Sequence, residues 1–173
     1  AREIPILGAL RQPQQLRSKA SPYGLAMLSR PRDVHLKSKV DRDNIMAKWT
    51  LRSAVKRCRA GFGVTVENLA NGFFWDLDEA KDLLSEVGVE DVVYTNCMFA
   101  PGTKCKRSRI RTNMPRVRRR LARVCRGGAS CDRTGAPHDS WRLVVKDGII
   151  IDFPSTMEAE FQSELCTELA LGY

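Results

Sequence analysis

Residues 64–94 read VTVENLANGFFWDLDEAKDLLSEVGVEDVVY, and this stretch decides the fold class. The β-branched run at 64–66 predicts a strand. Apolar residues at helical spacing predict a helix over 77–87, which Gly88 ends, and residues 91–94 predict a second strand. A strand, helix, strand unit is typical of α/β proteins, in which a helix joins parallel strands. We therefore expect an α/β fold with a parallel or mixed sheet and flanking helices.

The segments on either side of this unit continue the α/β pattern. Four prolines before residue 32 predict an extended lead-in over 1–43. One amphipathic helix is expected over 43–60, where Pro and Gly are absent and apolar residues recur at helical spacing. Later segments predict a strand at 108–112, a helix at 115–126, a loop at 127–140, a hairpin at 143–153 and a helix at 155–170. We expect residues 44–173 to form a single α/β domain, as a fragment of a larger one.

The composition excludes several classes of protein. A hydrophobic content of 43% with 28% charged residues indicates a folded chain rather than a disordered one. No apolar run approaches the roughly 20 residues of a membrane span, so we expect no membrane partner. The six cysteines lack the dense spacing of a disulfide framework, and no secretory segment precedes them. Reduced thiols in the nucleus or cytoplasm fit this pattern.

Positive charge is concentrated in one arginine-rich segment. Lys and Arg number 29 against 20 Asp and Glu, and residues 104–126 carry eleven cations and no acidic residue. A one-sided charge of this kind is typical of a groove that binds nucleic acid, most of all DNA. On a helix that begins at Pro115, four arginines share one face. We interpret them as phosphate contacts rather than as solvated charge: Arg116, Arg119, Arg120 and Arg123.

Glu67 and Asn68 follow the first predicted strand. Side chains at the carboxyl ends of strands line the ligand crevice of an open α/β sheet. A carboxylic acid there can hydrogen-bond a ring nitrogen of a base, and the neighbouring asparagine can fix the turn. The alternative is that Glu67 is solvated and Asn68 tolerates a left-handed turn.

Several short motifs along the chain resemble one family. They are Val66-Glu67-Asn68-Leu69, Phe74-Trp75, Asn96-Cys97-Met98-Phe99, Lys106-Arg107-Ser108-Arg109 and Thr112-Asn113. Together with residues 1–5 and 16–25, they look like the later portion of cytosine-5 DNA methyltransferase-like domains of protist mobile elements. The resemblance implies an incomplete Rossmann-like methyltransferase fold. It also implies Glu67 as the base-binding acid with Asn68 beside it, and Arg107 and Arg109 as residues that hold the base or its backbone.

Two departures from this family bear on activity. Leu69 stands where the family has proline or valine, and the chain lacks both the glycine-rich loop for S-adenosylmethionine and the Pro-Cys nucleophile loop. In such enzymes a thiolate attacks the flipped base, and the acid stabilises its ring nitrogen. We therefore expect this chain alone to bind no cofactor and to transfer no methyl group. Two alternatives stay open: a non-enzymatic nucleic-acid-binding module, and a structural subunit of an acidic assembly.

Cysteine and histidine side chains late in the chain offer metal-ligating atoms. Cys125, Cys131 and His138 are candidates, with Cys97 and Cys105 as further partners. Their spacing matches no paired two-residue zinc knuckle. The sequence therefore predicts free thiols and no metal site.

Overall fold

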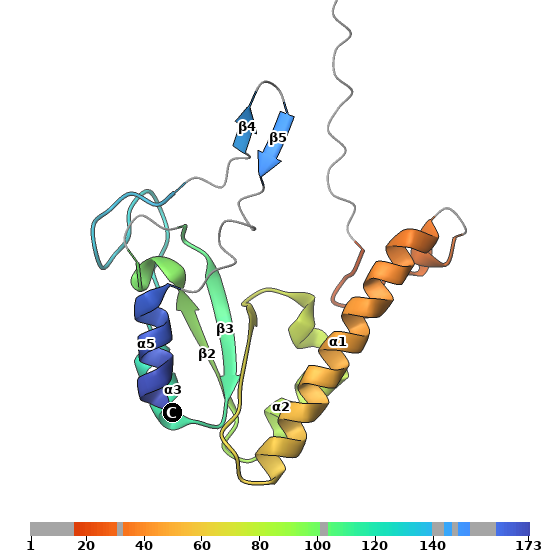
Figure 1. Cartoon of the computed structure of the whole chain (residues 1–173), viewed down its shortest axis with the longest axis horizontal. Coiled ribbons are helices and arrows are strands. Elements are labelled where there is room, and N and C mark those ends of the chain that lie inside the picture. The colour runs from red at the N-terminus through yellow and green to blue at the C-terminus, as the bar shows by residue number, and fades with distance from the viewer. Residues whose placement is uncertain (1–15, 31–32, 101–103, 140–143, 147–148, 153–161) are drawn as a thin grey trace, which may run out of the picture.

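A computed structural model describes residues 16–30, 33–100, 104–139, 144–146, 149–152 and 162–173. A three-stranded sheet lies between two pairs of helices, with α1 and α2 on one side and α3 and α5 on the other (Figure 1). A separate hairpin pairs β4 (Val144–Lys146) with β5 (Ile149–Asp152), as the sequence predicted. The mixed α/β class is confirmed.

The sheet has the order β1-β3-β2, with β1 at Thr65–Leu69, β3 at Arg107–Thr112 and β2 at Glu90–Thr95. Both outer strands are antiparallel to the central β3. The prediction of a parallel or mixed sheet is therefore wrong. β1 and β2 run in the same direction, as the predicted strand, helix, strand unit requires. They do not pair with each other, however, because β3 lies between them and forms antiparallel hydrogen bonds with both.

The first long helix, α1 (Val34–Arg59), begins inside the segment predicted as an extended lead-in. Its first turns have little apolar periodicity, which is why the sequence pattern missed them. They are stabilised by an ion pair between Lys37 and Asp41, four residues apart, and by the buried Val40. Across the described residues, no helix combines the length and apolarity that crossing a membrane requires.

The remaining helices are short. They are α2 (Asp78–Ser85), α3 (Pro115–Leu121) and α5 (Ser163–Gly172), with 3-10 turns η1 (Ala26–Ser29), η3 (Phe73–Asp76) and η4 (Asn96–Met98). Residues 155–161, the start of the last predicted helix, lie outside the described residues. The predicted helix over 115–126 ends at Leu121, because the next residues bind to Thr95 of β2 instead of continuing the helix. The N–H of Thr95 donates to the Arg123 carbonyl at 3.0 Å, and the N–H of Cys125 donates to Thr95 Oγ1 at 2.6 Å.

Apolar side chains fill both faces of the sheet. On the side of α1 and α2, the buried residues are Leu51, Ala54, Val64, Val66, Trp75, Leu77, Ala80, Leu83 and Val89. On the side of α3 and α5, they are Val92, Tyr94, Phe99, Ile110, Val117, Leu121 and Leu165. The central strand is thus covered on both faces, and its ends carry the functional candidates.

Candidate nucleic-acid groove and cysteine–histidine cluster

Glu67 and Asn68 lie within β1, which continues to Leu69, rather than after its end. Asn68 Oδ1 accepts the N–H of Leu69 at 2.8 Å. Both residues are half-buried and line an open groove of about 620 Å³ together with residues of α1. Burial raises the pKa of the Tyr94 phenol, and the nearby Glu67 carboxylate raises this pKa further.

The arginines expected opposite Glu67 lie on the other face of the sheet. Glu67 pairs with Ile110, and successive side chains of a strand point to opposite faces, so Arg109 points away from Glu67. Arg109 donates to Asp91 at 3.3 Å, while Arg107 donates to the Cys125 carbonyl at 3.4 Å. The structure thus separates Glu67 from both arginines.

The turn after β1 is closed by the chain's own atoms. A Cβ at Gly72 would lie 3.1 Å from Asn68 Oδ1 and 3.2 Å from the Leu69 carbonyl. The indole N–H of Trp75 donates to the same carbonyl at 2.8 Å. These contacts hold the turn in place from within the chain.

Several cations of the arginine-rich segment hold the fold together. The buried Arg111 binds Asp91 through two hydrogen bonds of 2.7 and 2.8 Å, and its guanidinium lies 4.9 Å from the Trp75 ring centre. Arg118 forms an ion pair with Glu90 on β2. These arginines have carboxylate partners within the chain.

Two of the four arginines predicted on one helical face are also paired. Arg120 donates to Glu168 of α5 at 2.7 Å. Arg123 donates to Glu164 and to Glu168, each at 2.9 Å, and its guanidinium lies 5.1 Å from the centre of the Phe99 ring. These two residues hold α3 against α5.

Arg116 and Arg119 differ from Arg111, Arg118, Arg120 and Arg123. Both side chains are exposed, and no ion pair among the described residues joins either of them to a carboxylate. They lie three residues apart on α3, so they are neighbours on its surface. Both line an open groove of about 490 Å³, together with Gly61, Gly63, Asn113, Met114, Pro115, Gly172 and Tyr173.

Tyr173 lines this groove, and Phe62 lies next to two of its lining residues in the chain. Phe62, between the two lining glycines, is 56% exposed, and Tyr173 is 66% exposed. Asn113 fixes the Phe62 loop, because its amide donates to the Phe62 carbonyl at 2.9 Å while its oxygen accepts the N–H of Val64 at 2.8 Å. The guanidinium of Arg57 lies 5.3 Å from the Phe62 ring centre. Cations and aromatic faces thus lie together at this end of the molecule.

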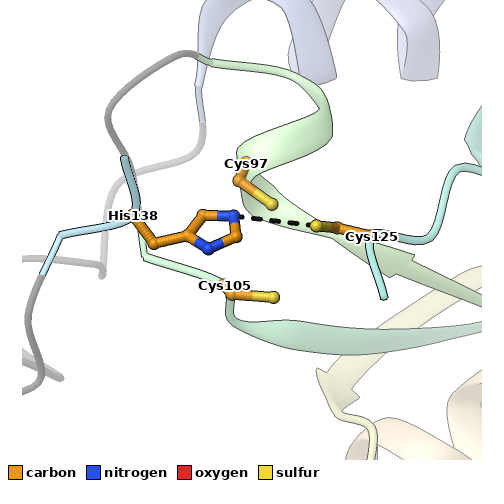
Figure 2. Close-up of side chains that lie close together, drawn as sticks. All are labelled: Cys97, Cys105, Cys125 and His138. Carbon is orange, nitrogen blue, oxygen red and sulfur yellow. Dashed lines mark hydrogen bonds between the residues drawn. The ribbon is translucent and has the colours of Figure 1, made fainter. Parts of the chain in front are cut away.

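The second candidate is a cluster of four side chains shown in Figure 2. The ligand atoms of Cys97, Cys105, Cys125 and His138 all lie within 4.8 Å of one another. Cys97 belongs to η4 after β2, Cys105 precedes β3, Cys125 follows α3, and His138 lies in the loop beyond. All six cysteines lie among the described residues, and none of them forms a disulfide.

Hydrogen bonds orient the cluster. His138 Nδ1 is 2.9 Å from the Gly128 carbonyl, so this nitrogen carries the proton, and Nε2 faces Cys125 Sγ at 3.6 Å (Figure 2). The N–H of Gly127 donates to Cys125 Sγ at 3.5 Å. The imidazole is therefore aimed at the sulfurs by its backbone contact.

The thiols differ in proton affinity. Burial raises the pKa of Cys97, and the neighbouring thiols of Cys125 and Cys131 raise it further. For Cys131, burial opposes the charge, but the N–H groups of Thr134 and Arg133 outweigh it and lower the pKa to about 7. Cys131 lies beside the four, with its thiol donating to the Cys97 carbonyl at 3.2 Å.

The sequence predicts no metal site at these cysteines and His138, because their spacing does not match the paired ligands of a zinc knuckle. The usable signal was the position of Cys97 and Cys105 at the adjoining ends of β2 and β3, which antiparallel pairing brings together. Sequence reasoning also missed Phe62 and Tyr173. Nothing in their spacing relates them to the arginines.

Comparison with known proteins finds no matching family model, no matching curated protein and no matching solved structure. The resemblance to methyltransferase-like domains therefore stays a prediction from the sequence.

Proposed function

We propose that this chain is a nucleic-acid-binding protein, and that single-stranded nucleic acid, with DNA as the first candidate, binds in the groove at Arg116 and Arg119. The main support for the proposal is a difference between the arginines of residues 104–126. Arg111, Arg118, Arg120 and Arg123 are paired with carboxylates, whereas the exposed Arg116 and Arg119 face an open groove. Cations left unneutralised beside a groove are what a phosphate backbone requires.

The chemistry of the groove favours a single strand over a duplex. Bases of a single strand stack on exposed aromatic rings, at about 1–3 kcal/mol per base, while arginines follow the phosphates. The exposed Tyr173 lines the same groove as Arg116 and Arg119, and the exposed Phe62 lies between two of its lining glycines. Gly61 leaves open space where another residue would have a side chain, so a strand can approach its backbone closely.

This proposal corresponds to the non-enzymatic alternative. Glu67 lines a different groove from the two arginines, and its expected arginine partners lie on the opposite face of the sheet. Binding in the Arg116 groove needs neither the base-binding acid nor a methyl donor.

The test is the salt dependence of binding to a labelled oligothymidylate, measured by fluorescence anisotropy. On a single strand each phosphate contact contributes about 0.7 to the slope of log K against log salt. Replacing both Arg116→Gln and Arg119→Gln should therefore weaken binding and reduce the slope by about 1.4, if each arginine contacts one phosphate.

A matched control changes the same charge elsewhere. Lys39 and Arg42 are exposed on α1, and Arg42 is about 25 Å along the helix from Arg59, which precedes the groove. The Lys39→Gln, Arg42→Gln protein should keep the slope nearly unchanged. Equal losses in the two variants would show that net charge alone drives binding and would refute the groove. A duplex that binds more tightly than the single strand would refute the stacking.

A further inference from the structure

We infer that Cys97, Cys105, Cys125 and His138 form a closed, four-coordinate zinc site. Their four ligand atoms already lie within 4.8 Å of one another, although each comes from a different part of the chain. Two are buried and two half-buried, so a metal ion between them would be shielded from water. The site is independent of the proposed nucleic-acid groove, with which it shares no residue.

The separations match tetrahedral zinc. Bond lengths of about 2.3 Å to sulfur and about 2.0 Å to nitrogen place neighbouring ligands roughly 3.8 Å apart for two sulfurs and roughly 3.5 Å for sulfur and nitrogen. Cys125 Sγ and His138 Nε2 are 3.6 Å apart. The upper limit of 4.8 Å across the whole set requires only small side-chain movements to reach the tetrahedral distances.

The ligand set selects the metal. Thiolates are soft ligands that favour zinc over magnesium or calcium, and imidazole suits zinc as well. A histidine that ligates zinc through one ring nitrogen normally donates its other N–H to a carbonyl or carboxylate. His138 has this arrangement, since Nδ1 bonds the Gly128 carbonyl and leaves Nε2 for the metal.

Nearby groups complement the charge of the site. Three thiolates, a neutral imidazole and a zinc ion carry one net negative charge. The Arg107 guanidinium donates to the Cys125 carbonyl at 3.4 Å, and the N–H of Gly127 donates to Cys125 Sγ at 3.5 Å. The protein thus supplies positive charge and N–H donors around the sulfurs.

Four protein ligands fill the coordination sphere, which is typical of a structural rather than a catalytic zinc. The ion would tie the adjoining ends of β2 and β3 to the segment after α3 and to the loop that carries His138. That loop, over the described residues 122–139, contains no helix or extended strand and little apolar packing besides its cysteines. Zinc would supply the constraint that secondary structure does not.

The first test uses the unchanged protein, expressed with zinc and purified without chelators. Metal analysis and native mass spectrometry should find one zinc ion per chain. X-ray absorption at the zinc edge should find three sulfur ligands and one nitrogen ligand. A protein that carries no zinc and binds no Co²⁺ in a tetrahedral thiolate environment would overturn the site, and four sulfur ligands would overturn the role of His138.

Variants then assign the ligands. Cys97→Ser, Cys125→Ser and His138→Gln should each weaken Co²⁺ binding at least tenfold and change its absorption spectrum. Cys166→Ser, at an exposed thiol outside the cluster, is the matched control and should bind as the unchanged protein does. Cys131→Ser should retain the metal, and loss of metal in this variant alone would overturn the ligand set.

Discussion

Asp91→Asn should destabilise the fold far more than a change at the neighbouring residue of the same strand. Asp91 receives two hydrogen bonds from the Arg111 guanidinium, whose side chain is 3% exposed between the sheet and α2. Arg111 also donates to the Ala80 carbonyl in α2 and lies over the Trp75 ring. The asparagine would leave this cation buried without a counter-charge.

The magnitude follows from the burial of the pair. Removing one partner of a buried ion pair costs about 3–5 kcal/mol, because the other charge stays desolvated. Asp91 keeps 25% side-chain exposure, so we expect the lower end, about 3 kcal/mol. For a chain of this size, that corresponds to a fall in melting temperature of roughly 6–12 °C.

Urea unfolding followed by circular dichroism measures the effect, with Glu90→Gln as the control. Glu90 pairs with Arg118 at the surface with 66% side-chain exposure, so its loss should cost at most about 1 kcal/mol. Replacing both Asp91→Leu and Arg111→Met should cost less than Asp91→Asn alone, because no unpaired charge remains. Equal losses for Asp91→Asn and Glu90→Gln would refute the reasoning.

Two further predictions concern the contact between α3 and α5. Gly172→Ala should lower the free energy of unfolding, measured in urea, by about 1–3 kcal/mol, because the added Cβ would lie 2.9 Å from Val117 Cα, a backbone atom that cannot move aside. The control Ala170→Ser, at an exposed position of the same helix, should change the free energy of unfolding little. The hydrogen bond from Arg120 lowers the pKa of Glu168 in the folded protein. The ionised carboxylate therefore stabilises the fold at any pH above its unfolded pKa of about 4.3, and this contribution is lost as the pH falls through the lower folded pKa. The stability difference between the unchanged protein and Glu168→Gln should thus be constant above the unfolded pKa of about 4.3 and shrink as the pH falls below it. A difference that grows on acidification would contradict this prediction.

The elements of the sheet were predictable from local pattern, but their order was not. The β-branched run before Glu67 and the apolar run before Tyr94 predicted β1 and β2, and both form. No local signal shows that the arginine-rich β3 occupies the centre. Its cations are accommodated there because Arg111 binds Asp91 on β2 and contacts Trp75, a long-range arrangement that the sequence does not reveal.

Charge counting located the basic segment correctly but overstated how much of it is free. The four arginines of the predicted helical face follow helical spacing in sequence, yet α3 ends at Leu121 and two of the four meet acidic residues of α5. The partners of Arg120 and Arg123 lie more than forty residues later in the chain. Sequence reasoning therefore had no basis for separating them from Arg116 and Arg119.

The two proposed sites lie at opposite ends of α3, and this position links them physically. A helix of seven residues is too short to persist without support, since isolated helices shorter than about 12 residues are marginal in water. Val117 and Leu121 pack its inner face against the core, so Arg116 and Arg119 keep their orientation toward the groove. At its other end the chain leaves Leu121 and reaches Cys125, whose N–H is bound to β2 and whose sulfur belongs to the cluster. A metal ion at Cys125 would therefore fix the segment that ends α3, and the arginines at its beginning would be presented on a rigid support rather than on a fraying turn.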